Sequence, residues 1–90
     1  MGKIKIKFLG TFHSVVNSEN VELEISGQRT LREILKLLSQ KFGEELAMHF
    51  RKIDYLNIFI NNVEYRGLKG LDTPIKEGDS IVIGHILAGG

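Results

Sequence analysis

Residues 21–42, VELEISGQRTLREILKLLSQKF, place a short strand directly before an amphipathic helix, and this succession decides the fold class. Residues 21–25 alternate apolar and acidic side chains, which is the period of a half-buried strand. Thr30 and Glu33 then fit a capping box at a helix start. Apolar residues follow at helical spacing: Leu31, Ile34, Leu35, Leu38 and Phe42. With Gly43 expected as the C-cap, the pattern predicts a helix over about residues 31–42.

A second alternating segment lies upstream, at residues 3–9, with three lysines on one face and Ile4, Ile6 and Phe8 on the other. An antiparallel pairing with residues 21–25 would set these lysines opposite glutamates, which is favourable across strands. The connection over residues 11–20 is long for a hairpin, and we expect it to form a turn of its own.

Further strands are predicted after the helix. Residues 56–61 are apolar enough for a central strand, and Asn61-Asn62 suits a tight turn into residues 63–65. Residues 80–83 form a last strand, whereas residues 44–54 show no clear pattern. The order β-β-α-β-β-β predicts an α+β fold, a mixed sheet of about five strands with one main helix across one face.

One aromatic residue is expected on the other face of this sheet. If Ile58 and Ile60 face the helix, alternation places Phe59 on the opposite side, where it could anchor a partner protein. The alternative is that a loop covers Phe59.

Composition limits the classes of function. Ninety residues make one domain, and 12 basic against 11 acidic side chains give a net charge of +1. Such a balance indicates neither a nucleic-acid nor a membrane partner. Cysteine is absent, and no signal peptide or apolar run of membrane-spanning length occurs, so we expect a cytoplasmic protein.

The usual catalytic constellations are missing. The histidines at 13, 49 and 85 are isolated in sequence, and Asp72 and Asp79 flank a turn rather than forming an evident carboxylate pair. No phosphate-binding glycine loop or nucleophile elbow is present. The sequence therefore offers no catalytic residues of its own, and no metal site is expected.

The chain ends in Ala88-Gly89-Gly90. Two glycines at two specified positions arise by chance roughly once in 200 sequences, and a frayed terminus remains the alternative interpretation. An extended Gly-Gly segment can thread a narrow channel, because glycine lacks a Cβ atom. Its carboxylate, ionised at neutral pH, could attack the α-phosphorus of ATP to give an acyl-adenylate. A partner enzyme would supply ATP and Mg²⁺, so no cofactor is expected on this chain.

The element order and the Ala-Gly-Gly end resemble the ubiquitin-like β-grasp sulfur carriers. More narrowly, residues 70–79, GLDTPIKEGD, followed by an apolar strand and Gly-Gly, resemble the small subunit of molybdopterin synthase. The resemblance implies that a ubiquitin-activator-like enzyme adenylates Gly90 and that sulfur transfer then forms a thiocarboxylate. It also implies that the large synthase subunit binds the tail, where the sulfur enters a pterin precursor.

The predicted organisation is a β-grasp domain over residues 1–85 and a flexible tail over residues 86–90. Gly89 and Gly90 match the functional motif, and Ile86, Leu87 and Ala88 join Phe59 as the expected partner interface. Family members often carry a proline pair before the small tail residues, whereas this chain has Gly84-His85-Ile86-Leu87. We therefore expect a less stiff tail entry, and interpret His85 as incidental.

Three alternatives to the molybdopterin function remain open. A ubiquitin-like modifier conjugated to lysines needs the same Gly-Gly end, and a related carrier could supply sulfur for tRNA thiolation. The length of 90 residues counts against a thiamine-type carrier. A β-grasp interaction domain without covalent chemistry is the third possibility, and it would not require Gly90.

Overall fold

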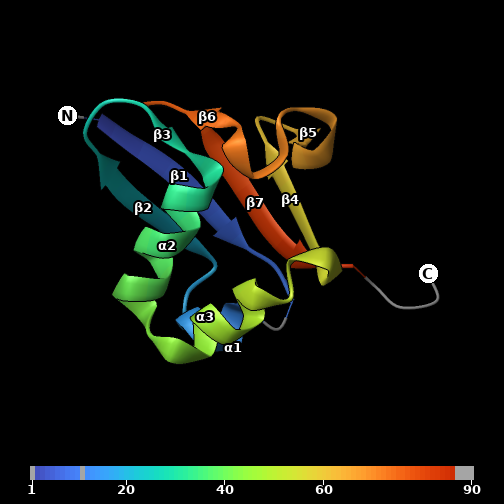
Figure 1. Cartoon of the computed structure of the whole chain (residues 1–90). Helices are drawn as coiled ribbons and strands as arrows, with labels where there is room; N and C mark the ends of the chain where they lie inside the picture. Colours follow the sequence, from blue (N-terminus) through green and yellow to red (C-terminus); the bar gives the residue numbers. More distant parts are fainter. Residues whose placement is uncertain (1, 11, 87–90) are drawn as a thin grey trace.

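The computed structural model describes residues 2–10 and 12–86. Five strands form one mixed sheet in the order β2-β1-β7-β4-β5 (Figure 1). Their bounds are β1 (Gly2–Phe8), β2 (Asn20–Ile25), β4 (Leu56–Ile60), β5 (Val63–Glu64) and β7 (Ser80–His85). The central strands β1 and β7 run parallel, and the other neighbours are antiparallel. The predicted fold class is confirmed.

The β1–β2 pairing matches the charge pattern of the sequence. Lys3 lies opposite Glu24 and Lys5 opposite Glu22 in the antiparallel register. The Lys3 ammonium also lies 3.8 Å from Glu22, a diagonal pair on the solvent-facing side. These pairs favour the register, although exposed ion pairs add less than about 1 kcal/mol each.

Helix α2 (Leu31–Phe42) lies across one face of the sheet (Figure 1). Its capping box is complete: Glu33 N–H donates to the Thr30 hydroxyl, and Thr30 N–H donates to the Glu33 carboxylate. Gly43 ends the helix at a φ of +100°, a conformation that favours glycine. The predicted bounds are therefore confirmed.

Several elements lie in segments that show no clear sequence pattern. Residues 44–55 contain helix α3 (Glu44–Arg51) and the 3₁₀ turn η1 (Ile53–Tyr55). The long β1–β2 connection contains the short helix α1 (Phe12–Val16). A small two-stranded sheet pairs β3 (Arg29–Thr30) with β6 (Pro74–Ile75), and two further 3₁₀ turns are η2 (Tyr65–Gly67) and η3 (Gly70–Asp72).

The core lies between the sheet and the helices. Ile4, Ile6 and Phe8 of β1 are fully buried, as the alternation predicted, together with Ile58 of β4. Three aromatic rings meet at the end of β1, with Phe8 centred 6.0 Å from Phe12 and 6.3 Å from Phe42. This packing stabilises the end of the sheet where β7 ends and the C-terminal segment begins.

Residues 70–79 contain two buried polar residues, Thr73 and Asp79. The Thr73 hydroxyl donates to the Gly70 carbonyl oxygen at 2.7 Å. The Asp79 carboxylate is buried and accepts from the Lys76 backbone N–H at 2.8 Å and from the Asn61 side chain at 3.0 Å. Asp79 therefore joins this loop to the β4–β5 turn.

Candidate functional site

The C-terminal segment leaves from the middle of the sheet. Strand β7, which lies between β1 and β4, ends at His85. The backbone N–H of Ile86 still donates to the Tyr55 carbonyl oxygen at 2.8 Å, and the Ile86 side chain is 42% exposed. The candidate residues Leu87, Ala88, Gly89 and Gly90 lie outside the described residues. The division between residues 85 and 86 therefore stays a prediction.

Three rings from separate elements meet at the root of this segment. The His85 ring stacks on Phe12 of α1, with centroids 4.4 Å apart and planes 6° apart. His85 Nε2 lies 3.3 Å from Nδ1 of His49, on α3. His49 and His85, which are isolated in sequence, therefore lie together in the structure, and His85 packs against the domain. Its interpretation as incidental to function stays a prediction. Sequence reasoning missed the contact because α3 itself was not predicted.

The environment of His85 changes its proton affinity. Burial and then the nearby His49 lower the pKa of His85 below its ordinary value. Both effects disfavour the charged imidazolium, through desolvation and through like-charge repulsion. The ring therefore favours its neutral form, in which a nitrogen can share one hydrogen bond with His49.

The face of the sheet away from α2 carries a concavity of about 370 Å³ beside this root. Phe59 lies on this face, as predicted, and is half-buried rather than covered or fully exposed. Val82 pairs with Phe59 across β7 and β4, and Leu9, which is 44% exposed, lines the same hollow. We call this surface, formed by Leu9, Phe59, Val82 and Gly84, the sheet-face concavity.

Gly84 keeps this concavity open beside Leu9. A Cβ atom at Gly84 would lie 3.4 Å from the Leu9 Cβ atom, at the edge of ordinary contact. Tyr55, whose carbonyl oxygen accepts the hydrogen bond from the Ile86 backbone N–H, is 66% exposed. Leu9, Phe59 and Val82 thus present apolar surface on one face of the sheet beside the last residues of β7, an arrangement typical of a protein interface.

The described residues carry no grouping of three or more metal-ligating side chains. None of the helices in ranges 2–10 and 12–86 is long and apolar enough to cross a membrane.

Comparison with known proteins identifies the family. The sequence model of the ThiS family matches residues 6–90, which include the Gly-Gly end and all of the described fold except residues 2–5 of β1. The chain belongs to the ThiS family. A candidate sulfur carrier protein of Archaeoglobus fulgidus is 31% identical over 74 residues, which cover 77% of this chain and 84% of the relative.

Solved structures share the ThiS-family fold at low identity. The solution structure of the Haloferax volcanii HVO 2177 protein has a TM-score of 0.82 and 22% identity, covering 99% of this chain and 87% of the other. The solution structure of the small archaeal modifier protein 1 of Methanosarcina acetivorans has a TM-score of 0.77 and 21% identity. The alignment covers 100% of this chain and 98% of that chain.

A complex provides a further comparison for this ThiS-family chain. The complex of subunits 1 and 2 of the molybdopterin-converting factor from Helicobacter pylori contains a chain with a TM-score of 0.61 and 22% identity. The alignment covers 98% of this chain and 99% of that chain. The protein is therefore a ubiquitin-like β-grasp member of a sulfur-carrier family.

Proposed function

We propose that this protein carries sulfur on its C-terminal glycine for molybdopterin synthesis, as the small subunit of molybdopterin synthase. The observation that carries the proposal is the central strand β7, which leads from the core to the Gly-Gly end within the family match. The GLDTPIKEGD sequence of residues 70–79 favours the molybdopterin pathway over related ones.

The proposed chemistry takes place on the carboxylate of Gly90. An oxygen of this carboxylate attacks the α-phosphorus of ATP, and pyrophosphate leaves to give an acyl-adenylate. A hydrosulfide ion from a sulfur donor then attacks the carbonyl carbon, and AMP leaves as the carbon–sulfur bond forms. Loss of a proton gives the thiocarboxylate. ATP, Mg²⁺ and the catalytic groups belong to the adenylating enzyme.

The length of the tail suits a mechanism in which this chain supplies the carboxylate and the partner enzyme supplies the catalytic groups. Four residues follow Ile86, and a fully extended chain covers at most about 3.6 Å per residue. Gly90 can therefore extend about 14 Å beyond Ile86. Such a length lets the carboxylate enter a partner's active site while the folded domain stays at the partner's surface.

The sheet-face concavity is the proposed docking surface for that partner. Phe59 and Val82 present apolar area beside Gly84 and His85, the last residues of β7, so one partner could cover the concavity and receive the tail together. The proposed partners are a ubiquitin-activator-like adenylating enzyme and the large synthase subunit, which would bind in turn. Leu87 and Ala88 would enter the partner's channel, and the cytoplasm is the proposed compartment.

Intact-protein mass spectrometry tests the proposal. The full chain and a chain lacking Gly90 are each incubated with an adenylating enzyme, Mg·ATP and a sulfide source. We expect the mass increase of one oxygen replaced by sulfur in the full chain alone. Transfer of that sulfur to a pterin precursor by the large subunit would then support the molybdopterin pathway.

Other outcomes favour the alternatives. A covalent adduct on a lysine of another protein would favour a modifier, and transfer of the sulfur to tRNA would favour the thiolation pathway. An unchanged mass in the presence of a demonstrably active enzyme would contradict the covalent chemistry and favour a non-covalent interaction domain.

A further inference from the structure

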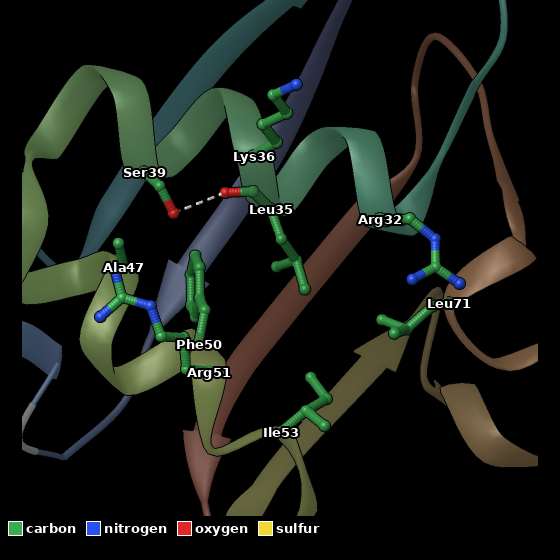
Figure 2. A pocket seen from close by; sticks show the side chains of 9 residues that line it. All are labelled: Arg32, Leu35, Lys36, Ser39, Ala47, Phe50, Arg51, Ile53 and Leu71. Atoms are coloured by element: carbon green, nitrogen blue, oxygen red, sulfur yellow. Dashed lines mark hydrogen bonds between the residues drawn. The ribbon is translucent and has the colours of Figure 1, made fainter.

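A second concave surface lies on the helical side of the sheet, opposite to the face that carries Phe59. It has a volume of about 330 Å³ and lies between α2 and α3, bounded by η1 and η3 (Figure 2). We call it the helical groove. Its volume is near the lower limit of ligand clefts, about 300 Å³, which is room for a few side chains.

The floor of the helical groove is apolar. Leu35 of α2, Phe50 of α3, Ile53 and Leu71 extend into the space between the elements (Figure 2). Phe50, Ile53 and Leu71 are only partly buried, so they leave apolar surface in contact with water. Covering such surface is favourable by about 25 cal/mol per Å².

Cations flank this floor. Arg32 and Arg51 stand at opposite ends of the groove, and Lys36 extends outward from its α2 side (Figure 2). Among the described residues that line the groove, none is acidic. A guanidinium group binds a carboxylate through two parallel hydrogen bonds, so each end of the floor suits a carboxylate.

The existing ion pairs of Arg32 and Arg51 are weak enough for a partner carboxylate to replace them. Arg32 lies 3.4 Å from Asp72, with side-chain exposures of 62% and 75%, and Arg51 pairs with Glu44 at similar exposure. Ion pairs this exposed contribute about 0–1 kcal/mol and exchange readily with water. A partner carboxylate that is partly desolvated against the apolar floor would compete well with them.

From this combination we propose that the helical groove binds a short amphipathic helix of a partner protein, with large apolar side chains on one face and carboxylates on either side. The apolar side chains would cover Leu35, Phe50 and Ile53, and the carboxylates would pair with Arg32 and Arg51. This is the helix-in-groove mode of recognition. The inference does not rest on the chemistry proposed for Gly90, because the groove and the sheet-face concavity occupy opposite faces.

Two designed peptides test the proposal by fluorescence anisotropy with the full chain. The first is a short helical peptide with leucines and phenylalanine on one face and glutamates beside them, and the second has lysines in place of the glutamates. We expect saturable binding of the acidic peptide, at least about tenfold tighter than binding of the lysine peptide. Equal affinities for the two peptides, or no saturable binding, would overturn the proposal.

Charge variants locate the binding site. Arg32→Glu is expected to weaken acidic-peptide binding by about tenfold or more, and Arg51→Gln to weaken it by a smaller factor. Lys41→Glu is the matched control, because Lys41 belongs to α2 but does not line the groove. A thermal melt of each variant confirms that it is folded.

Amide chemical shifts complete the test. Binding in the helical groove should perturb Leu35, Ala47 and Ile53, whereas binding in the sheet-face concavity would perturb Phe59 and Val82 and contradict the inference. An equal loss of affinity in the Lys41 control would show attraction to net charge alone, which also counts against the groove. Deletion of Gly90 should leave peptide binding unchanged.

Discussion

Phe59 owes its exposure to the two-residue period of β4. Its neighbours Ile58 and Ile60 are buried against the helical side, so the Phe59 ring lies on the opposite face beside Val82. A half-buried aromatic ring in a concavity is the kind of residue on which binding energy concentrates at protein interfaces.

We therefore expect Phe59→Ala to raise the KM of the adenylating enzyme for this protein by about tenfold or more. The kcat at saturation should change little, because the Gly90 carboxylate is unaltered. Steady-state ATP–pyrophosphate exchange measures both constants. Val63→Ala is the control, since Val63 is an exposed apolar residue on β5 that does not line the sheet-face concavity. An unchanged KM for Phe59→Ala would exclude Phe59 from the interface.

His85 gives the folded state a dependence on pH. Its pKa is lowered in the folded protein by burial and by His49, whereas the unfolded chain has the ordinary value of about 6.5. Between the two values the unfolded state binds more protons, so the free energy of unfolding falls as the pH falls below about 6.5. The stabilising contribution is fully present above that pH.

Urea unfolding at about pH 7.5 and about pH 5.5 checks this dependence. His85→Asn should reduce the loss of stability between the two pH values relative to the natural chain, because the titrating group is gone. A loss of the same size in both proteins would show that other groups produce the pH dependence.

At the scale of elements, residues 70–79 act mainly in the folding of the domain. Asp79 accepts hydrogen bonds from Asn61 and Lys76, and Thr73 closes the η3 turn. Burial raises the pKa of Asp79, but the hydrogen bonds from Asn61 and Lys76 outweigh it and lower the pKa below the ordinary value. The sequence that resembles molybdopterin synthase thus has a structural role, separate from the sheet-face concavity.

Asp79→Ala should lower the free energy of unfolding by about 1–3 kcal/mol, because the Asn61 side chain and the Lys76 backbone N–H lose a buried, charged acceptor. Asp72→Ala is the matched control in the same loop. Its carboxylate is 75% exposed and pairs only with an exposed arginine among the described residues, so we expect a change within about 0.5 kcal/mol. Equilibrium urea titration measures both, and equal losses would contradict a special role for Asp79.

At the scale of the whole molecule, folding and the proposed chemistry occupy separate parts of the chain. Every buried core side chain among the described residues lies between Ile4 and Ile83, before the root of the C-terminal segment. We therefore predict that the core forms without the Gly-Gly end.

Deletion of Gly90 should accordingly leave the free energy of unfolding unchanged to within about 0.5 kcal/mol. The same deletion should abolish thiocarboxylate formation. Thermal and urea unfolding of the two chains measure the first expectation. A large loss of stability would mean that the terminus packs on the domain, and would weaken the interpretation of residues 86–90 as a separate tail.

The sequence by itself determined the elements whose physics is local. Alternation defined β1 and β2, because side chains of a strand point to opposite faces, and the apolar residues 56–61 indicated β4. The Thr30–Glu33 capping box with its apolar stripe defined α2. The sequence also placed Phe59 on the open face. Helix α3 was missed although Leu46 and Phe50 are spaced by one turn and Glu44 and Glu45 precede them, since eight residues give a weak periodic signal.

Only the tertiary structure decided what lies together across long separations. His49 and His85 are 36 positions apart and meet because α3 packs beside the end of β7. The helical groove likewise needs α2, α3, η1 and η3 together. Contacts of this kind depend on how elements pack around one core. The periodicity of a single segment therefore does not predict them.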